Sequence, residues 1–524
     1  MTTTTGAPVA RRRAVGGGRS VVALGALAGL VSAGLLLGTA TALAGLLAAA
    51  DPFVAVGDAV VRLSPPTVTS WAIATFGTYD KLVLFVGIGG VLAVVAAASG
   101  ALATRRLAAG LVAPLVLVVA ALTAVVAAPG AAPLDVLPLL AGTALAAPGF
   151  VVLVRRAGAT GSAHDESRRG DSSRRGVLVA AAGVGAAAAA VAVTGRLVAG
   201  RLRDAAASRA ALVLPPPLDP APPAPVGAQA SPATPFRTPP ADFYRIDTAL
   251  TVPQVRAEDW RLRVHGRVER PLDLDWDALT SFEVVEREIT LVCVSNPVGG
   301  ELLGNQVWRG VRLADVLAAA GVRGGADMLL STSTDGWTAS TPLEALVDSD
   351  DALLAFAMGG EPLPPEHGYP VRMVVPGLYG YVSATKWVTD LEVTTFADDT
   401  AFWTPRGYAE RAPVKVGSRI DVPGPFERLD AGTVVVAGVA WAPGRGIGQV
   451  EVSVDDGDWQ VAELAPVPSS LTWQQWRLEW AAEPGQHRLQ VRATTTDGEV
   501  QTEDRAPVDP DGATGWHSVV VTVA

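Results

Sequence analysis

Residues 290–300 read TLVCVSNPVGG, and this stretch decides how the second half of the chain is to be understood. It overlaps EREITLVCV, a run that predicts a strand, and it contains Cys293, the only cysteine among 524 residues. The sequence before it indicates that this part of the chain is exported, and exported proteins mostly use cysteines in pairs as disulfides. A lone thiol there is either an inert buried side chain or a reactive group.

Composition divides the chain into an apolar part and an acidic part. Hydrophobic residues make up 49% of the chain and charged residues 18%, and the apolar excess lies in the first 200 positions. Residues 1–240 carry 19 Lys and Arg against 9 Asp and Glu (+10), whereas residues 241–524 carry 22 against 42 (−20). This indicates a membrane protein with a soluble half that is too acidic to favour nucleic acid as a partner.

Five apolar runs are long enough to cross a bilayer, which takes about 20 helical residues. A transmembrane region, residues 1–204, is therefore predicted to contain five helices, at 21–50, 82–103, 107–128, 134–154 and 177–199. Arginines before the first run, between the second and third, and between the fourth and fifth mark those segments as cytoplasmic. We expect a multi-pass protein of the cell membrane, with a cytoplasmic N-terminus and everything after the fifth span outside.

Arg174 and Arg175 precede the last span, in SSRRGVLVAAAGVGAAAAA from Ser172. Paired arginines before a mildly apolar run rich in Ala and Gly resemble a twin-arginine export signal, which serves proteins that fold around a cofactor before export. The simpler alternative is that the pair only sets the topology of the span.

Residues 205–240 are predicted to be a proline-rich linker. LPPPLDPAPPAPVGAQASPATPFRTPP, from Leu214, suits an extended spacer that holds the soluble half away from the bilayer. All five histidines lie outside the predicted spans: His164, His265, His367, His487 and His517. Because haem between helices normally takes axial ligands such as His, we expect no haem in this chain.

The soluble half contains two patterns of secondary structure. In residues 241–400, WRLRVHG and EREITLVCV predict strands, VRLADVLAAAG predicts an amphipathic helix that ends at Gly321, and YPVRMVVPG predicts a buried strand. This region is an α/β or α+β domain. In residues 401–524, TVVVAGVAWA, GQVEVSVDDGDWQVAEL, HRLQVRATTTDG and WHSVVVTVA alternate apolar and polar residues at short spacing. They predict an immunoglobulin-like β-sandwich.

Six blocks from Phe243 onward resemble, in order, those of the sulfite oxidase family of molybdopterin-dependent oxidoreductases. FYRIDTALTVP is similar to the family's opening block, TLVCVSNPVGG to its metal-ligand block and VWRGVRLADVL to the helix block that follows. LLAFAMGGEPLPPEHGYPVRMVVPG is similar to the pterin-contacting block, GYVSATKWV to the phosphate-binding turn, and GVAWAPGRGIGQVEVSVDDGDW to the start of the C-terminal sandwich. The resemblance implies a molybdopterin domain at 241–400 and an immunoglobulin-like domain at 401–524, which makes dimer contacts in relatives.

The resemblance also implies roles for individual residues. Cys293 would bind molybdenum as a thiolate, a soft ligand for a metal that the pterin already holds. Contacts with the pterin and its phosphate are implied for six residues: Phe243, Arg245, His367, Arg372, Ser383 and Lys386. Arginine forms bidentate contacts with phosphate and lysine supplies a point charge. SATK carries one residue more than the Ser-x-Lys turn of some relatives.

The residues expected at the substrate are a partial match. Sulfite-oxidising relatives bind their anion with several arginines and use a tyrosine close to the metal. Arg245 and Arg445 match two of these arginines and are expected to act in catalysis. A third arginine falls at Val298 and the tyrosine falls at Phe356, so a cation and a proton-handling phenol are lost.

The sequence thus predicts a membrane-anchored molybdenum oxidoreductase that moves an oxygen atom or two electrons to or from a small sulfur oxyanion or sulfoxide. Its expected partners are a small-molecule substrate and a separate electron carrier, either a cytochrome or a quinone-linked membrane haem protein, and a homodimer is open. One alternative is a reductase of sulfoxides, including oxidised methionine in exported proteins. An alternative of another class is a surface-tethered binding protein without enzymatic activity, in which Cys293 is inert.

Overall fold

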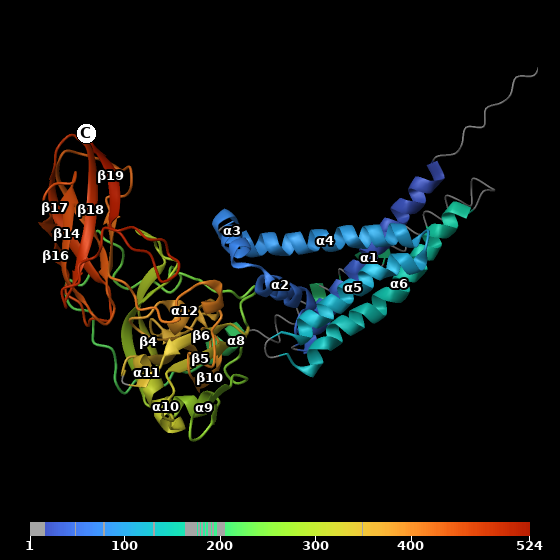
Figure 1. The fold of residues 1–524 in the computed structure, drawn as a ribbon, viewed down its shortest axis with the longest axis horizontal. Coiled ribbons are helices and arrows are strands. Elements are labelled where there is room, and N and C mark those ends of the chain that lie inside the picture. Colours follow the sequence, from blue (N-terminus) through green and yellow to red (C-terminus); the bar gives the residue numbers. More distant parts are fainter. Residues whose placement is uncertain are drawn as a thin grey trace, which may run out of the picture. The chain divides into compact units, whose positions relative to one another are not determined.

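The structure, a computed structural model, describes residues 16–47, 49–76, 79–128, 131–162, 205–347 and 349–524, together with isolated positions between 176 and 195. The chain divides between Arg203 and Asp204 into two compact units. In Figure 1 the first unit runs from blue to teal and the second from green to red.

Long apolar helices make up the first unit: α1 (Gly16–Leu47), α4 (Asp80–Ala103), α5 (Leu107–Val126) and α6 (Leu137–Ser162), the last preceded by the short helix η2 (Pro133–Val136). Among the described residues, these are the helices whose length and composition suffice to cross a membrane. They correspond to the first four predicted spans. The fifth predicted span, 177–199, falls mostly outside the described residues.

Two shorter helices, α2 (Pro52–Leu63) and α3 (Pro66–Phe76), lie between the first two predicted spans. Asp51 caps α2, because its carboxylate accepts the N–H of Phe53 at 2.8 Å, and Pro52 stands at the first helical position. The connection between the first two predicted spans therefore contains helices that the sequence analysis did not predict. A search for spans of about 20 residues does not detect helices of this length.

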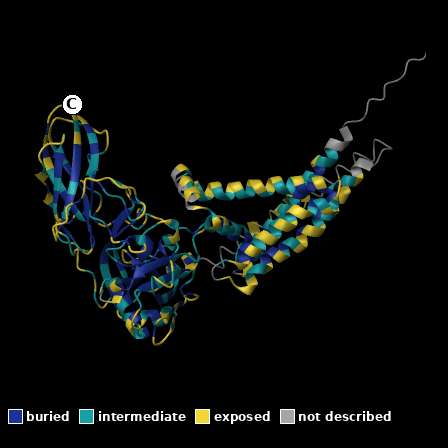
Figure 2. Cartoon of the chain, in the orientation of Figure 1, coloured by how far each residue is buried: buried dark blue, intermediate teal, exposed yellow. Residues whose placement is uncertain are grey.

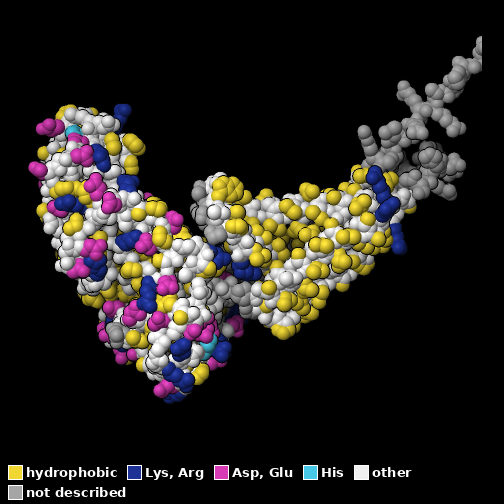
Figure 3. Space-filling model, viewed as in Figure 1, with side chains coloured by type: hydrophobic (Ala, Val, Ile, Leu, Met, Phe, Trp, Pro, Cys, Tyr) yellow, Lys and Arg dark blue, Asp and Glu magenta, His cyan; other side chains and the backbone are white. Residues whose placement is uncertain are grey.

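Glycines let α1 and α4 approach closely. A Cβ atom on Gly29 would lie 1.9 Å from the carbonyl oxygen of Ala96, and one on Gly100 would lie 2.0 Å from that of Gly25. Only a hydrogen atom fits at these contacts, which is the packing expected of helices in lipid. Hydrophobic side chains also cover the outer surface of the helices in Figure 3, as a lipid-facing surface requires.

The second unit begins with an α+β region built on two sheets. The first sheet has the order β2-β1-β10-β5-β6, in which only β1 and β10 are parallel. Its strands are β1 (Leu262–Gly266), β2 (Leu272–Leu274), β5 (Met328–Ser333), β6 (Thr338–Pro342) and β10 (Val388–Thr394). The second, antiparallel sheet has the order β3-β4-β7-β8, with β9 on β7. Its strands are β3 (Val284–Val292), β4 (Leu303–Arg312), β7 (Leu353–Met358), β8 (Glu361–Pro362) and β9 (Arg372–Val374).

Short helices accompany these sheets: α8 (Ala205–Ala211), α9 (Trp276–Thr280), α10 (Leu313–Ala320), α11 (Glu344–Val347), η3 (Pro365–His367), α12 (Gly380–Ser383) and η4 (Thr404–Arg406). The predicted amphipathic helix is α10, and it ends at Gly321, whose φ of 73° is a left-handed conformation that glycine adopts without strain. The strands are the most deeply buried part of the unit in Figure 2.

The rest of the unit is a β-rich region of two further sheets, with the orders β11-β13-β17-β16 and β12-β19-β18-β14-β15. Their strands are β11 (Gly417–Val422), β12 (Arg428–Leu429), β13 (Gly432–Trp441), β14 (Ile447–Val454), β15 (Gln460–Val461), β16 (Glu463–Leu464), β17 (Gln474–Ala482), β18 (Gly485–Thr495) and β19 (His517–Val523). Val436 and Trp476 of one sheet share a buried core with Leu489 and Val521 of the other. The sheets therefore pack face to face. The four segments predicted as strands match β13, β14, β18 and β19, whereas the immunoglobulin-like classification stays a prediction.

The proline-rich segment lies along the second unit and does not form a free spacer. The N–H of Leu218 donates to the carbonyl of Val284 in β3 at 2.8 Å. Arg237 forms a two-pronged ion pair with Glu288, at 2.8 and 2.9 Å, and the Glu288 side chain is 2% exposed. The prediction of an extended spacer that holds the soluble half away from the bilayer is wrong for these residues, because their backbone and charged groups form hydrogen bonds and ion pairs with the sheet.

Candidate active site

Cys293 is the first residue after β3, where the strand enters a tight loop. Its N–H donates to the carbonyl of Leu302 at 2.9 Å, and its carbonyl accepts the N–H of Asn296 at 3.0 Å. Asn296 also closes the loop, because its side-chain oxygen accepts the N–H of Leu302 at 2.8 Å. The thiol is free and 7% exposed, and burial raises its pKa. The loop thus holds one soft ligand in a fixed position with little access to water.

The C-terminal region fastens this loop from outside. Arg419 of β11 donates to the carbonyl of Gly300 at 2.8 Å and pairs with the buried carboxylate of Asp421 at 2.6 Å. The ring of His517 lies against Gly299, where a Cβ atom would meet it at 2.3 Å. Burial and Arg419 lower the pKa of His517 to about 4, so the ring is neutral near pH 7 and its Nδ1 accepts a backbone N–H of β11 at 3.0 Å.

A second cluster gathers cations from the predicted pterin-contacting blocks, and Arg372 of β9 is its most buried member. Its guanidinium, 6% exposed, donates to the carbonyls of His367, Met373 and Ala384 at 3.1, 3.3 and 3.4 Å and lies 5.0 Å from the Trp308 ring centre. No described carboxylate forms an ion pair with it, and burial lowers its pKa to about 10. A buried cation without a counter-charge is costly, so this position fits a bound anion such as the pterin phosphate.

Lys386 extends the cluster. Its ammonium, on a side chain 9% exposed, binds the carboxylate of Asp247 at 2.7 Å and the carbonyl of Glu366 at 3.1 Å. Burial, partly offset by Asp247, lowers the pKa of Lys386 to about 8. Arg245 pairs with the same carboxylate at 3.0 Å from a side chain that is 43% exposed. The cluster contains three cations, on Arg245, Arg372 and Lys386, and two carboxylates, on Asp247 and Glu366. Its net charge is therefore positive.

Aromatic rings form a wall beside these cations. Phe243, 5% exposed, stacks on Tyr244 with 5.2 Å between ring centres and meets His367 edge-on at 5.9 Å. Burial and Arg372 lower the pKa of His367 to about 4, and its Nε2 donates to the carbonyl of Pro240 at 3.1 Å. The structure therefore brings Phe243 and His367 together with the charged cluster, whereas their contacts with a pterin stay a prediction.

Two predicted site residues make other contacts. The hydroxyl of Ser383, at the end of α12, donates to the carbonyls of Leu378 and Tyr379 at 3.1 and 3.0 Å, so it bonds the backbone of its own turn. Arg445, between β13 and β14, pairs with Asp497 at 2.9 Å and Glu499 at 2.6 Å. These two carboxylates neutralise Arg445, and its contacts do not support the expected role in binding an anionic substrate.

The hydroxyl groups around Cys293 come from positions that the sequence did not single out. Phe356, the position expected to lie near the metal, is fully buried in β7, and its ring packs on a tryptophan of α9 at 5.3 Å, as a core residue does. Three phenols, Tyr244, Tyr379 and Tyr408, instead have a raised pKa, that of Tyr379 being about 12; burial is the largest cause for each, and nearby Asp511 and Asp509 add to it for Tyr379 and Tyr408.

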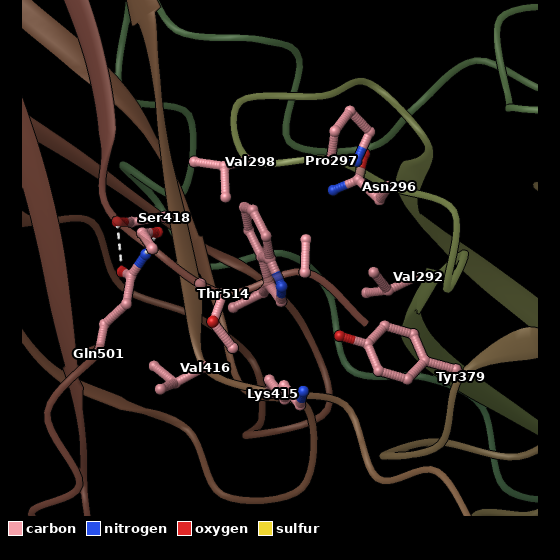
Figure 4. A pocket seen from close by; sticks show the side chains of 14 residues that line it. Val292, Asn296, Pro297, Val298, Tyr379, Lys415, Val416, Ser418, Gln501 and Thr514 are labelled. Carbon is pink, nitrogen blue, oxygen red and sulfur yellow. Dashed lines mark hydrogen bonds between the residues drawn. The ribbon is translucent and has the colours of Figure 1, made fainter. Parts of the chain in front are cut away.

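A pocket opens beside the Cys293 loop, between this loop and the C-terminal region (Figure 4). Its walls include Val292 at the end of β3, Asn296 and Val298 of the loop, and Tyr379 and Lys415. Val298 therefore does line a cavity, as expected for a position that holds an arginine in relatives, and it makes this part of the wall apolar.

The second unit is similar to known molybdopterin proteins. The family model described as the oxidoreductase molybdopterin binding domain matches residues 249–403. Mitochondrial sulfite oxidase of Homo sapiens is 30% identical over 332 residues, which cover 52% of this chain and 60% of that protein. Sulfite oxidase of Gallus gallus is 31% identical over 330 residues, which cover 53% and 72%. The oxidoreductase YuiH of Bacillus subtilis (strain 168) is 38% identical over 152 residues, which cover 29% and 73%.

The chain belongs to the sulfite oxidase family of molybdopterin oxidoreductases, which confirms the resemblance found in its sequence blocks. It spans about 60% of the length of the human and macaque sulfite oxidases that it matches.

Proposed function

We propose that the chain is a membrane-anchored molybdenum oxidoreductase whose active site faces outside the cytoplasm, and that it transfers an oxygen atom to or from a small sulfur oxyanion or sulfoxide while two electrons move in the opposite direction. The observation that carries the proposal is the buried guanidinium of Arg372, which has no carboxylate partner among the described residues. An anionic cofactor beside Cys293 explains why such a costly cation is retained.

Each residue of the site has a proposed role in holding the cofactor. Cys293 would supply a thiolate to the metal, and its buried loop would keep water away from that bond. Arg372 and Lys386 would hold the phosphate by charge-assisted hydrogen bonds, with Arg245 adding charge from the more exposed side. Phe243 would pack against the pterin. The molybdenum and pterin supply the redox chemistry when they are bound.

The reaction couples oxygen transfer to electrons and protons. Oxidation of sulfite takes an oxygen atom from water and releases two electrons and two protons, whereas reduction of a sulfoxide consumes them and releases water. Burial raises the pKa of Tyr244 and Tyr379, so both phenols are protonated near pH 7 and would be available as hydrogen-bond donors to a substrate. The electrons require a partner, and we propose a separate cytochrome or quinone-linked membrane haem protein.

The membrane part would act as an anchor. The apolar helices α1, α4, α5 and α6 are long enough to span a bilayer. A fifth span at 177–199, preceded by the arginine pair at 174 and 175, would place the second unit outside.

Metal analysis and dye-linked assays test the proposal. Full-length protein purified in detergent should contain molybdenum and pterin, and it should oxidise sulfite or reduce a sulfoxide with an artificial electron carrier. The second reaction would identify a sulfoxide reductase, the candidate that the apolar Val298 favours. Protein that contains no molybdenum would support a non-enzymatic binding protein. Protein that contains molybdenum but performs neither reaction would refute both substrate assignments.

A further inference from the structure

Asp247 contacts two of the three cations in the cluster formed by Arg245, Arg372 and Lys386. Its carboxylate accepts hydrogen bonds from the ammonium of Lys386 at 2.7 Å and from the Nε of Arg245 at 3.0 Å. The side chains of Asp247 and Lys386 are 5% and 9% exposed and form a buried ion pair, whereas that of Arg245 is 43% exposed. A carboxylate of the chain itself therefore already binds two of the cations that would attract an anionic ligand.

The third cation, on Arg372, is held differently. Its guanidinium donates to three backbone carbonyl groups, and among the described residues no carboxylate forms an ion pair with it. An anion that enters the cluster would find one uncompensated charge, on Arg372. It would gain less from Lys386 and Arg245, because Asp247 already neutralises part of their charge and repels the anion.

This distribution of charge distinguishes a free phosphate ion from a phosphate that belongs to a larger ligand. Inorganic phosphate binds only through its charge and its hydrogen bonds, so repulsion by a nearby carboxylate removes much of its affinity. A cofactor that also packs against Phe243 and binds through Cys293 would have other sources of binding free energy. Such a cofactor would tolerate the same repulsion.

We propose that Asp247 is a specificity-determining residue of the cation cluster, whose carboxylate keeps inorganic phosphate and similar small anions out and so leaves the site open for the phosphate of a larger cofactor. The same carboxylate stabilises the cofactor-free protein, because it balances the charge of the buried Lys386. The inference rests on the proposed function for the identity of that cofactor.

Inorganic phosphate is the probe that tests this role. Full-length protein made in cells that lack the cofactor is purified in detergent, and phosphate binding is measured by isothermal titration calorimetry at constant ionic strength. We expect Asp247→Asn to lower the Kd of phosphate about ten- to hundredfold relative to the parent, because the substitution removes the repelling charge and keeps the size of the side chain. Without phosphate the variant should unfold at a lower temperature than the parent, and phosphate should restore most of the difference.

Two further variants show where the phosphate binds. Asp398→Asn is the matched control, because it removes the same charge from an ion pair with Arg267 at 2.7 Å, in which the side chains are 54% and 45% exposed. It should leave the Kd of phosphate unchanged. Lys386→Met added to Asp247→Asn should abolish most of the gain in affinity, because the cation that the first substitution releases is then absent.

The inference is overturned if Asp247→Asn binds phosphate no more tightly than the parent; weaker binding would show that the carboxylate positions the cations instead. It is also overturned if Asp398→Asn gains as much affinity, or if the double variant keeps the gain. Should Asp247→Asn not fold in phosphate-free buffer, it should fold in phosphate but not in sodium chloride of equal ionic strength, and failure in both salts would contradict the inference.

The two proposals fail in different ways, because phosphate binding needs neither metal nor turnover. A protein that never acquires pterin, but whose Asp247→Asn variant binds phosphate more tightly, would refute only the proposed function. A protein that acquires molybdenum and pterin, but whose Asp247→Asn variant gains no affinity for phosphate, would refute only the role of Asp247.

Discussion

Replacement of Arg372 by methionine should change the stability of cofactor-free protein little but weaken cofactor binding strongly. Without a bound anion, burial lowers the pKa of Arg372 from 12.5 to about 10, which corresponds to about 3 kcal/mol of destabilisation at 1.4 kcal/mol per pKa unit. The side chain recovers a similar amount from its three carbonyl contacts, at about 0.5–1.5 kcal/mol each. We therefore expect Arg372→Met to change the stability of cofactor-free protein by no more than about 1 kcal/mol.

The same substitution should weaken cofactor binding strongly. A hydrogen bond to a charged group contributes about 1.5–3 kcal/mol, so loss of the guanidinium should lower pterin affinity about ten- to hundredfold. The assay compares pterin and molybdenum retained after dialysis with the thermal unfolding of protein made in cells that lack the cofactor.

Arg309→Met is the matched control. Arg309 lies next to Trp308 in β4 but pairs with Glu286 at 2.7 Å, so its loss should destabilise both forms and leave pterin retention unchanged. If Arg372→Met retained pterin at the parental level, the assignment of the anion site would be refuted.

Further variants test the loop clamp, the buried histidine and the export signal. Arg419→Met should leave Asp421 as an unpaired buried carboxylate, lower the unfolding temperature and alter the Mo(V) resonance. Adding Asp421→Asn should restore the stability but not the resonance. Recovery of both would show that Arg419 does not position the Cys293 loop. His517 has a pKa of about 4 in the folded protein against 6.5 in the unfolded chain, so its full contribution to the free energy of unfolding is present above pH 6.5 and falls by about 3 kcal/mol as the pH drops to 4. The unfolding temperature of His517→Gln should fall less over this interval. An unchanged pH dependence in this variant would contradict the prediction. Lysine at both 174 and 175 should leave a C-terminal epitope protected from external protease, whereas normal exposure would show that the arginine pair only sets topology.

Local patterns were sufficient to predict some of the strands and helices of the fold. Alternation predicted β13, β14, β18 and β19, and the glycine at 321 marked the end of α10, because these features depend on near neighbours in the chain. The capping pair Asp51 and Pro52 was a signal for α2, but α2 is too short for a search based on membrane spans. Packing of the proline-rich segment on β3 depends on distant partners, and composition alone indicated a free spacer.

The site could be predicted only within its own sequence blocks. Those blocks identified Cys293 and Arg372, but no local pattern shows that Arg372 lacks a carboxylate, because its surroundings come from the whole domain. Arg419 reaches the Cys293 loop from a position 119 residues beyond Gly300, so its role appears only in three dimensions. The position of Tyr379 in the pocket could not be predicted from the sequence either, because its burial and its neighbours depend on the tertiary structure.

The central claim, that Cys293 binds the metal of a molybdopterin enzyme, is tested most directly by X-ray absorption at the molybdenum edge of parental and Cys293→Ser protein. We expect the parent to contain molybdenum, and the variant either to lose the metal or to show one sulfur neighbour fewer. Equal molybdenum content and an equal number of sulfur neighbours in the two proteins would contradict the claim.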